Sequence, residues 1–106
     1  MRIIPLSNIP AQTLKVILGG QDCAISVYWR QTRLYLDLAV GDTAVWRGAI
    51  CQNGANVLQG RSRFFRGSLH FFDTQGQRPP HFEHLNERFF LVYVDADEPL
   101  PEGLRF

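Results

Sequence analysis

The sequence predicts an all-β fold, either a single-domain antiparallel sandwich or a small open barrel, with extended termini. The main observation is the segment Cys23–Val40, in which apolar and polar residues alternate with a period of two over two successive runs. Such alternation is typical of strands with one buried and one wetter face. Two further observations agree with it. No stretch of ten or more residues has helical periodicity, and short apolar runs are separated by turn residues at regular spacing.

The two runs are predicted to pair as the central hairpin of the sheet. Only Gln31–Thr32 connects them, which favours an antiparallel arrangement. This connection lacks the Asn-Gly or Asp-Gly signal, so the turn type and the register stay open. The residues expected on one face are Cys23, Ile25, Val27 and Trp29 in the first run and Leu34, Leu36, Leu38 and Val40 in the second.

The chain before the hairpin is predicted to add an edge element and one strand. Pro5 interrupts the apolar run Arg2–Leu6, and because proline lacks a backbone N–H, this run is expected to be an edge strand or an extended arm that Pro10 ends. Gln12–Leu18 alternates and leads through the turn residues Gly19–Asp22 into the hairpin. These strands therefore form a predicted meander.

The chain after the hairpin is predicted to be less regular. Gly60 and Gly67 divide Val57–Phe72 into two short strands, or mark a bulge in one long bent strand. The polar segment Gln77–Glu87 is expected to be a loop with one helical turn near Glu83–Glu87. The other predicted elements are a strand at Thr43–Ile50, a loop at Gln52–Asn56, a turn at Asp73–Gly76, a strand at Phe89–Val94 and an acidic, proline-containing tail at Asp95–Phe106 that is expected to lie extended.

Length, charge and cysteine content limit the class of protein. The 106 residues fit one β domain, with 1–10 as an N-terminal arm or edge strand and 95–106 as the acidic tail. The net charge of +1 gives no global field to hold a polyanion. Cys23 and Cys51 have no metal-ligand spacing and are expected to be reduced core residues. No N-terminal run is long enough for a signal peptide or a membrane span, so folding in a reducing cytoplasm is expected.

Charge is uneven along the chain. Arginines dominate residues 30–66, whereas acidic residues dominate residues 73–102. Opposed blocks of this kind are expected to pair within the fold or to dock between copies.

One arginine-rich segment combines charge with aromatic rings. Single-strand-binding proteins use this combination to contact phosphates and to stack on bases. The alternative is an edge strand whose Phe packs inward and whose Arg discourages edge pairing. The low net charge and the lack of a glycine–aromatic repeat argue against nucleic acid. The residues in question are Arg61, Arg63, Phe64, Phe65 and Arg66.

A metal site in the loop is a further alternative. His81, Glu83 and His84, with His70 or Asp73 nearby, offer nitrogen and oxygen ligands for zinc. They lack the i, i+4 histidine pair of a helical zinc site, so solvated loop residues are the simpler interpretation. No nucleophile motif or phosphate loop occurs, and the chain is predicted not to be an enzyme and to carry no cofactor.

Several short motifs follow one another in a fixed order along most of the chain. They are Ile3–Leu6 with Ile9–Pro10 and Gln12, Leu18–Gln21, Tyr28, Tyr35–Leu38, Leu69–Asp73 with Gly76, and Arg88–Tyr93. In the order and spacing of these motifs and in total length, the chain resembles the small baseplate plug proteins of contractile-tailed bacteriophages. Residues 43–66 match least.

The resemblance implies a structural virion component of the tail baseplate. Such plugs are present in several copies against hub and tube proteins, and the family offers no catalytic residues to carry over. We therefore expect multivalent protein–protein contacts, with self-association as a further option, in a particle assembled in the host cytoplasm. The two ends, 1–10 and 95–106, are candidate arms that augment or clamp a neighbour. The residues expected to make contacts are Ile3, Ile4, Pro5, Arg61, Arg63, Phe64, Phe65 and Arg66.

Overall fold

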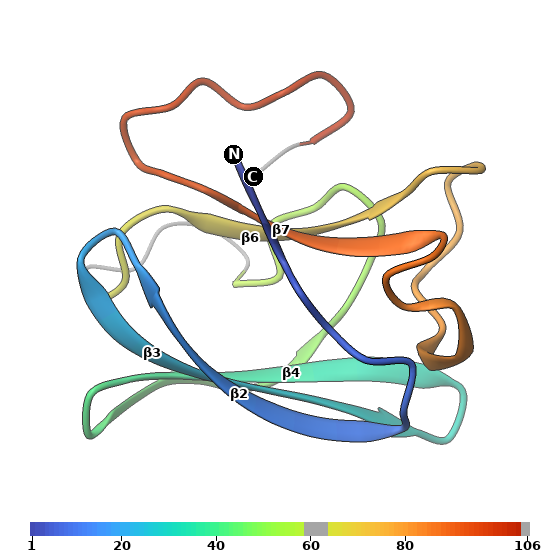
Figure 1. The fold of residues 1–106 in the computed structure, drawn as a ribbon, viewed down its shortest axis with the longest axis horizontal. Coiled ribbons are helices and arrows are strands. Elements are labelled where there is room, and N and C mark those ends of the chain that lie inside the picture. Colours follow the sequence, from blue (N-terminus) through green and yellow to red (C-terminus); the bar gives the residue numbers. More distant parts are fainter. Residues whose placement is uncertain (59–63, 105–106) are drawn as a thin grey trace.

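The protein folds as two antiparallel sheets that lie one above the other (Figure 1). The computed structural model describes residues 1–58 and 64–104. One sheet has three strands in the order β1-β7-β6, and the other has four in the order β2-β3-β4-β5. Of the two predicted architectures, the sandwich is confirmed. The elements are β1 (Arg2–Ile4), β2 (Ala11–Leu18), β3 (Gln21–Arg30), β4 (Arg33–Val40), β5 (Thr43–Ile50), β6 (Ser68–Asp73), the 3-10 helix η1 (Phe82–His84) and β7 (Phe89–Val94).

The four-stranded sheet is the predicted meander around the central hairpin. Its register places Ile25 opposite Leu38 and Val27 opposite Leu36, so the apolar faces of β3 and β4 coincide. These side chains are buried, as predicted from the alternation. Trp29 at the end of β3 is only partly buried and packs at the margin of the core. Cross-strand apolar pairs on one face stabilise this sheet and fix its register.

The N-terminal run, predicted as either an edge strand or an extended arm, contains the short edge strand β1. β1 pairs with β7 alone, with Ile4 opposite Leu91. Ile4 on this strand and Leu6 just after it are both buried, so the N-terminal segment closes one side of the core between the sheets. Beyond Pro5, the side chain of Gln12 exchanges two hydrogen bonds with the backbone of Ser7, which holds the crossing to the other sheet.

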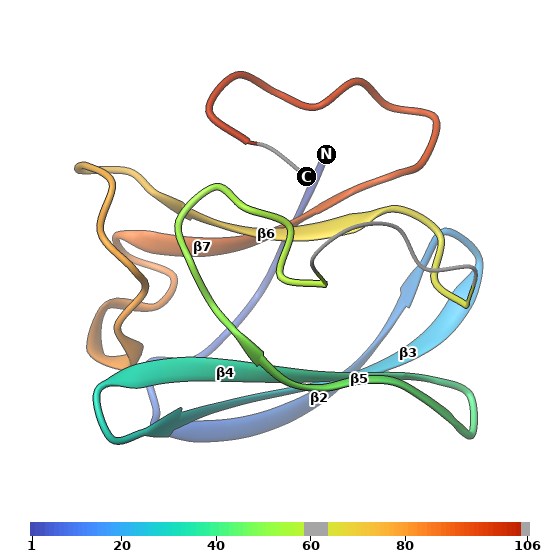
Figure 2. The ribbon, with the colours of Figure 1, turned by 180° about the vertical axis from the view of Figure 1, so that it is seen from behind.

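The prediction for Val57–Phe72 is wrong in part. Val57 and Leu58 lie in a turn, and the first regular strand of this region is β6 from Ser68. The buried side chain of Asn56 accepts hydrogen bonds from the N–H groups of Leu58 and Leu69, which favours a turn over a strand. The preceding residues, 53–56, run from β5 across to β6 and cover its edge through isolated bridges (Figure 2). Gly60 and residues 61–63 lie outside the described part of the chain.

The loop between β6 and β7 contains the predicted helical turn, as η1, and the predicted turn after β6. The buried carboxylate of Asp73 accepts hydrogen bonds from the backbone N–H groups of Gln75 and Arg78 and from the guanidinium of Arg88. This carboxylate therefore joins the end of β6 to the start of β7. Within residues 1–58 and 64–104, no helix has the length and apolar character needed to cross a membrane.

Candidate interaction surfaces

The outer side of the three-stranded sheet is apolar and is partly roofed by the C-terminal segment. Residues 95–104 loop back over the sheet, near the N-terminus (Figure 1). Between them lies an apolar groove of about 250 Å³, which we call the terminal groove. Ile3 and Phe72 remain 53% and 39% exposed, so the groove offers large apolar side chains to solvent. Its apolar lining includes Ile3, Phe72, Phe90, Val92, Pro101 and Leu104.

Ion pairs hold the tail over this groove. Arg66 Nε lies 2.9 Å from Asp95 Oδ1, and the same guanidinium also pairs with Asp97. The N-terminal amine of Met1 pairs with Glu98. The basic and acidic blocks of the sequence thus meet within the fold at Arg66. The N–H of Asp97 and the charge of Arg66 lower the pKa of Asp95.

The tail is less straight than its prolines suggest. The N–H of Glu98 donates to the carbonyl of Asp95, and that of Leu104 donates to the carbonyl of Pro101. Two turns therefore bring Leu104 over the sheet instead of leaving the segment fully extended.

Replacing Arg66 with Gln is expected to loosen the tail without unfolding the sandwich. Its ion pairs are largely exposed, and exposed pairs contribute little to global stability. Cleavage by a glutamate-specific protease after Glu102 should accelerate, while the melting temperature stays close to that of the wild type. Arg47→Gln, on exposed β5, is the matched control. Equal protection of the tail in both variants would contradict this prediction.

The predicted contact residues fall into different environments. Ile3, Pro5 and Phe64 are exposed, whereas Ile4 and Phe65 are buried in the core. The ring of Phe65 packs edge-on against Tyr93, with 5.7 Å between centroids. Arg61 and Arg63 lie outside the described residues. The side chains of Ile4 and Phe65 are therefore closed to a partner in this structure.

The same placement weakens the nucleic-acid alternative. A stacking strip needs exposed rings beside unengaged cations. Here Phe65 is buried and Arg66 is held by two acidic side chains, so Phe64 is the one exposed ring in the described part of the strip. Consecutive Phe residues point to opposite sides of an extended chain, but the sequence did not indicate which of the two would enter the core.

The loop histidines His81 and His84 lie with ring centroids 6.4 Å apart, but His70 on β6 is engaged elsewhere. His70 is fully buried, where its Nδ1–H donates to the Gly54 carbonyl at 2.8 Å and its Nε2 accepts from the Ser68 hydroxyl at 2.7 Å. The ring of His81 packs at a tilt against Trp29, with 4.3 Å between ring centroids. The described part of the chain contains no group of three His, Cys, Asp or Glu able to hold a metal ion.

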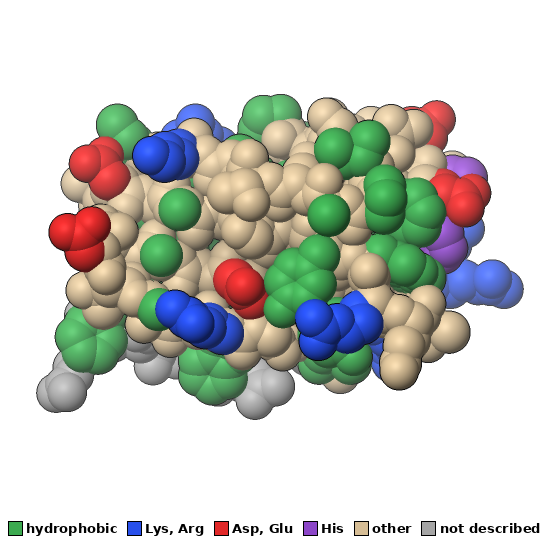
Figure 3. Space-filling view, turned by 90° about the horizontal axis from the view of Figure 1, so that it is seen from below, with side chains coloured by type: hydrophobic (Ala, Val, Ile, Leu, Met, Phe, Trp, Pro, Cys, Tyr) green, Lys and Arg blue, Asp and Glu red, His purple; other side chains and the backbone are tan. Residues whose placement is uncertain are grey.

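The outer face of the four-stranded sheet is a second exposed surface. We call it the outer β3–β4 face, because β3 and β4 form its middle. Viewed from below, its middle carries few long charged side chains, and acidic groups appear at both ends of the view and once near the middle (Figure 3). The outward residues are Asp22, Ala24, Ser26, Tyr28 and Arg30 on β3 and Arg33, Tyr35, Asp37 and Ala39 on β4.

An aromatic pair and a carboxylate lie together on this face. The rings of Tyr28 and Tyr35 stack with centroids 6.0 Å apart. Asp37 Oδ1 accepts hydrogen bonds from the Tyr28 hydroxyl at 3.0 Å and from the Gly48 N–H at 2.7 Å. Burial, together with the bond to Asp37, raises the pKa of Tyr28. The guanidinium of Arg30 lies 5.7 Å from the centre of the Tyr28 ring.

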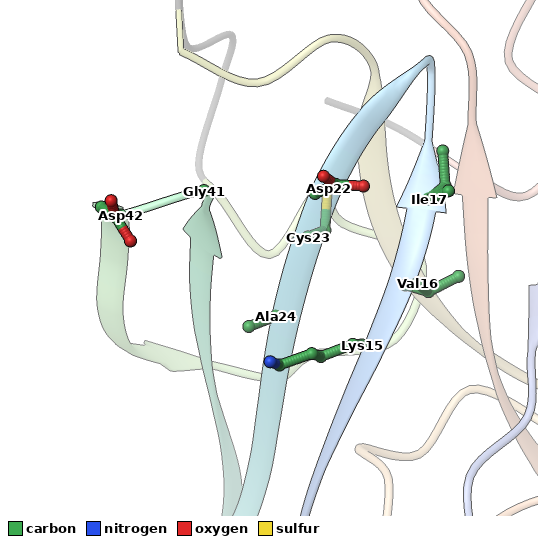
Figure 4. A pocket seen from close by; sticks show the side chains of 8 residues that line it. All are labelled: Lys15, Val16, Ile17, Asp22, Cys23, Ala24, Gly41 and Asp42. Carbon is green, nitrogen blue, oxygen red and sulfur yellow. The ribbon is translucent and has the colours of Figure 1, made fainter.

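The other end of the face is hollowed. A depression of about 410 Å³ is bordered by Lys15, Asp22, Ala24 and Asp42, which come from β2, β3 and the β4–β5 turn (Figure 4). The amino-acid pattern did not reveal this hollow, since alternation marks which face is buried but not the relief of the wetter face. The sequence signal that could have indicated the hollow is the presence of small residues at outward positions, such as Ala24 and Ala39.

Comparison with known proteins identifies the chain's family. No curated protein matches the sequence. The sequence does match, over residues 1–97, the family described as "Cyanophage baseplate Pam3 plug gp18". The chain therefore belongs to this family of phage baseplate plugs.

Proposed function

We propose that this baseplate component is a structural, non-catalytic plug that binds hub and tube proteins through its terminal groove. The observation that carries the proposal is the groove itself, where exposed Ile3 and Phe72 flank an apolar hollow beneath the tail. Exposed apolar patches bordered by polar groups are typical of protein–protein contacts. Several copies in one baseplate would make such contacts multivalent. We propose that the protein is made, and the baseplate assembled, in the host cytoplasm.

The tail covers part of this groove and can move when its ion pairs are exchanged. Its ion pairs through Arg66 are exposed, so exchanging them for pairs with a neighbouring protein costs little free energy. An apolar side chain of a hub or tube protein could then fill the groove between the tail and the sheet. The arms predicted from the sequence act here by framing a groove rather than by reaching away from the body.

Point variants test this proposal better than deletions. Removing residues 1–10 would delete β1 and the buried side chains of Ile4 and Leu6, and the fold would suffer. Ile3→Gln and Phe72→Gln change exposed groove residues only. Ile17→Gln is the matched control, because Ile17 is 61% exposed but lies on β2 of the other sheet.

The measurement is light scattering of the purified protein mixed with hub or tube proteins of the same phage. A stable complex is expected with the wild type and with Ile17→Gln. Each groove variant should weaken binding by about tenfold or more, as the loss of an apolar anchor does. A wild type that ignores both partners, or groove variants that bind as the wild type does, would refute the proposal.

A further inference from the structure

The outward residues of β3 form a self-complementary row. In order, they are Asp22, Ala24, Ser26, Tyr28 and Arg30. Around the central Ser26, the acidic Asp22 at one end of the row mirrors the basic Arg30 at the other. The small Ala24 beside the hollow mirrors the aromatic Tyr28. Asp22 and Arg30 are about 26 Å apart along the strand, so they do not pair within one chain.

The neighbouring strand repeats the pattern about the same centre. Ser26 pairs across the sheet with Asp37, and Tyr28 pairs with Tyr35. Arg33 lies at the basic end of β4, and Asp42 in the β4–β5 turn lies at the acidic end. The acidic side chains Asp22 and Asp42 thus lie at the end with the hollow, which Lys15 also borders, and the arginines of both strands lie at the end with the Tyr28–Tyr35 pair.

We propose that a second copy of this chain packs face to face on the outer β3–β4 face. The two-fold axis lies in the plane between the two packed sheets. It is perpendicular to the strands and passes over Ser26 of both copies. It brings Asp22 of each copy opposite Arg30 of the other and sets the Tyr28 ring of each copy against the hollow beside Ala24. This contact is separate from the terminal groove, which lies on the other sheet.

Charge and shape both favour this occupant. Among residues 1–58 and 64–104, no ion-pair partner is found for Asp22, Asp42, Arg30 or Arg33, so these charges remain available. Small side chains at Ala24, Ser26 and Ala39 allow the sheets to approach the spacing of about 10 Å found between packed sheets. A surface that complements itself under a two-fold rotation is the requirement of an isologous dimer.

The size of the face sets the conditions for the test. It measures about 26 Å along the strands and about 14 Å across four strands, or about 360 Å² per copy, which is below the area of a standard specific interface and in the range of weak contacts. We therefore expect a dimer of modest affinity that is detected at high protein concentration and at low salt.

The axis also brings Asp37 toward its own image, because Asp37 is the cross-strand partner of Ser26. Tyr28 and Gly48 already donate hydrogen bonds to this carboxylate, which limits the repulsion. Asp37→Asn keeps an oxygen acceptor and removes the like charges. It should tighten the dimer by up to about fivefold.

The test is sedimentation equilibrium of the purified chain, alone and as charge-reversal variants. The wild type should approach twice its mass of 12.1 kDa at high concentration. Asp22→Arg alone and Arg30→Asp alone should each weaken the dimer by about tenfold or more, because each homodimer then contains two like-charge contacts. An equal mixture of the two single variants should dimerise again, since each copy then faces opposite charge on the other.

Recovery on mixing distinguishes the two-fold contact from a simple loss of folding. An unfolded single variant would show in its circular dichroism and would not regain the dimer when mixed. A wild type that stays monomeric at every concentration overturns the proposal, as does a dimer that neither reversal weakens. If the wild type is monomeric but the same reversals abolish capture of a hub or tube protein, the face belongs to that partner instead.

Discussion

Replacing Asp73 with Ala is expected to lower the free energy of unfolding by about 3 kcal/mol. The Asp73 side chain is fully buried and accepts hydrogen bonds from both Nε and Nη2 of Arg88, at 2.7 and 2.8 Å. Removing it leaves the guanidinium without its partner and frees the N–H groups of Gln75 and Arg78. The loss stays at the low end for broken buried pairs because the Arg88 side chain is 24% exposed.

The same carboxylate should make the fold sensitive to acid. Hydrogen bonds from Arg88 hold the pKa of Asp73 well below its ordinary value of 3.8. A folded state with the lower pKa binds fewer protons than the unfolded state, so the stabilisation is present above about pH 4 and is lost as the pH falls below it. Urea denaturation at neutral pH and at about pH 3 measures both effects.

Asp95→Ala is the control for this prediction, because that carboxylate lies in the exposed tail. It should leave the midpoint of urea denaturation nearly unchanged. The wild type should lose more stability on acidification than Asp73→Ala does. A variant as stable as the wild type at neutral pH, or equally acid-sensitive, would show that the buried pair does not support the loop.

The regular part of the fold was predictable because its strands have one buried face and one solvent-exposed face. Period-two alternation in β2, β3 and β4 therefore reports burial directly. The register, which the sequence left open, brings the apolar faces of these strands together. The strand at Phe89–Val94 was equally easy to predict from the sequence, since β7 is central in its sheet and nearly all its residues are apolar.

The irregular part depends on single polar side chains that leave no periodic signal. Asn56 replaces strand pairing with side-chain hydrogen bonds, and Asp73 joins two strands through Arg88. Sequence reasoning placed a turn at Asp73 but did not predict its ion pair, because the partner lies far along the chain.

The candidate surfaces were predictable only as segments. The sequence indicated that the two ends would matter, but whether they reach outward or fold back is decided by ion pairs between distant residues, such as Arg66 with Asp95. Ile4 and Ile3 are adjacent and equally apolar, yet one enters the core and the other borders the groove. Which of two such neighbours turns inward depends on the register of β1 against β7, which the sequence does not specify.

Gly67→Ala should destabilise the fold by about 3 kcal/mol, because it combines backbone strain with a clash. Gly67 has a φ of +99°, a conformation that residues with a side chain rarely adopt. A Cβ here would overlap the Val94 carbonyl oxygen of the paired strand and would lie 2.7 Å from Tyr93 Cε1. The Tyr93 hydroxyl donates to the Arg66 carbonyl at 2.6 Å, and burial raises its pKa to about 12, so this junction is tightly packed.

Gly20→Ala is the matched control for the clash. Gly20 also has a positive φ, of +76°, but nothing lies within 4 Å of the position its Cβ would take. That variant should carry the backbone strain alone, about 1 kcal/mol. The difference between the two midpoints of urea denaturation measures the clash at β7. Because Gly67 is next to Arg66, its variant should also expose the tail to protease, and Gly20→Ala should not. Equal losses in the two variants would mean that the chain at Gly67 can move away from β7 at little cost.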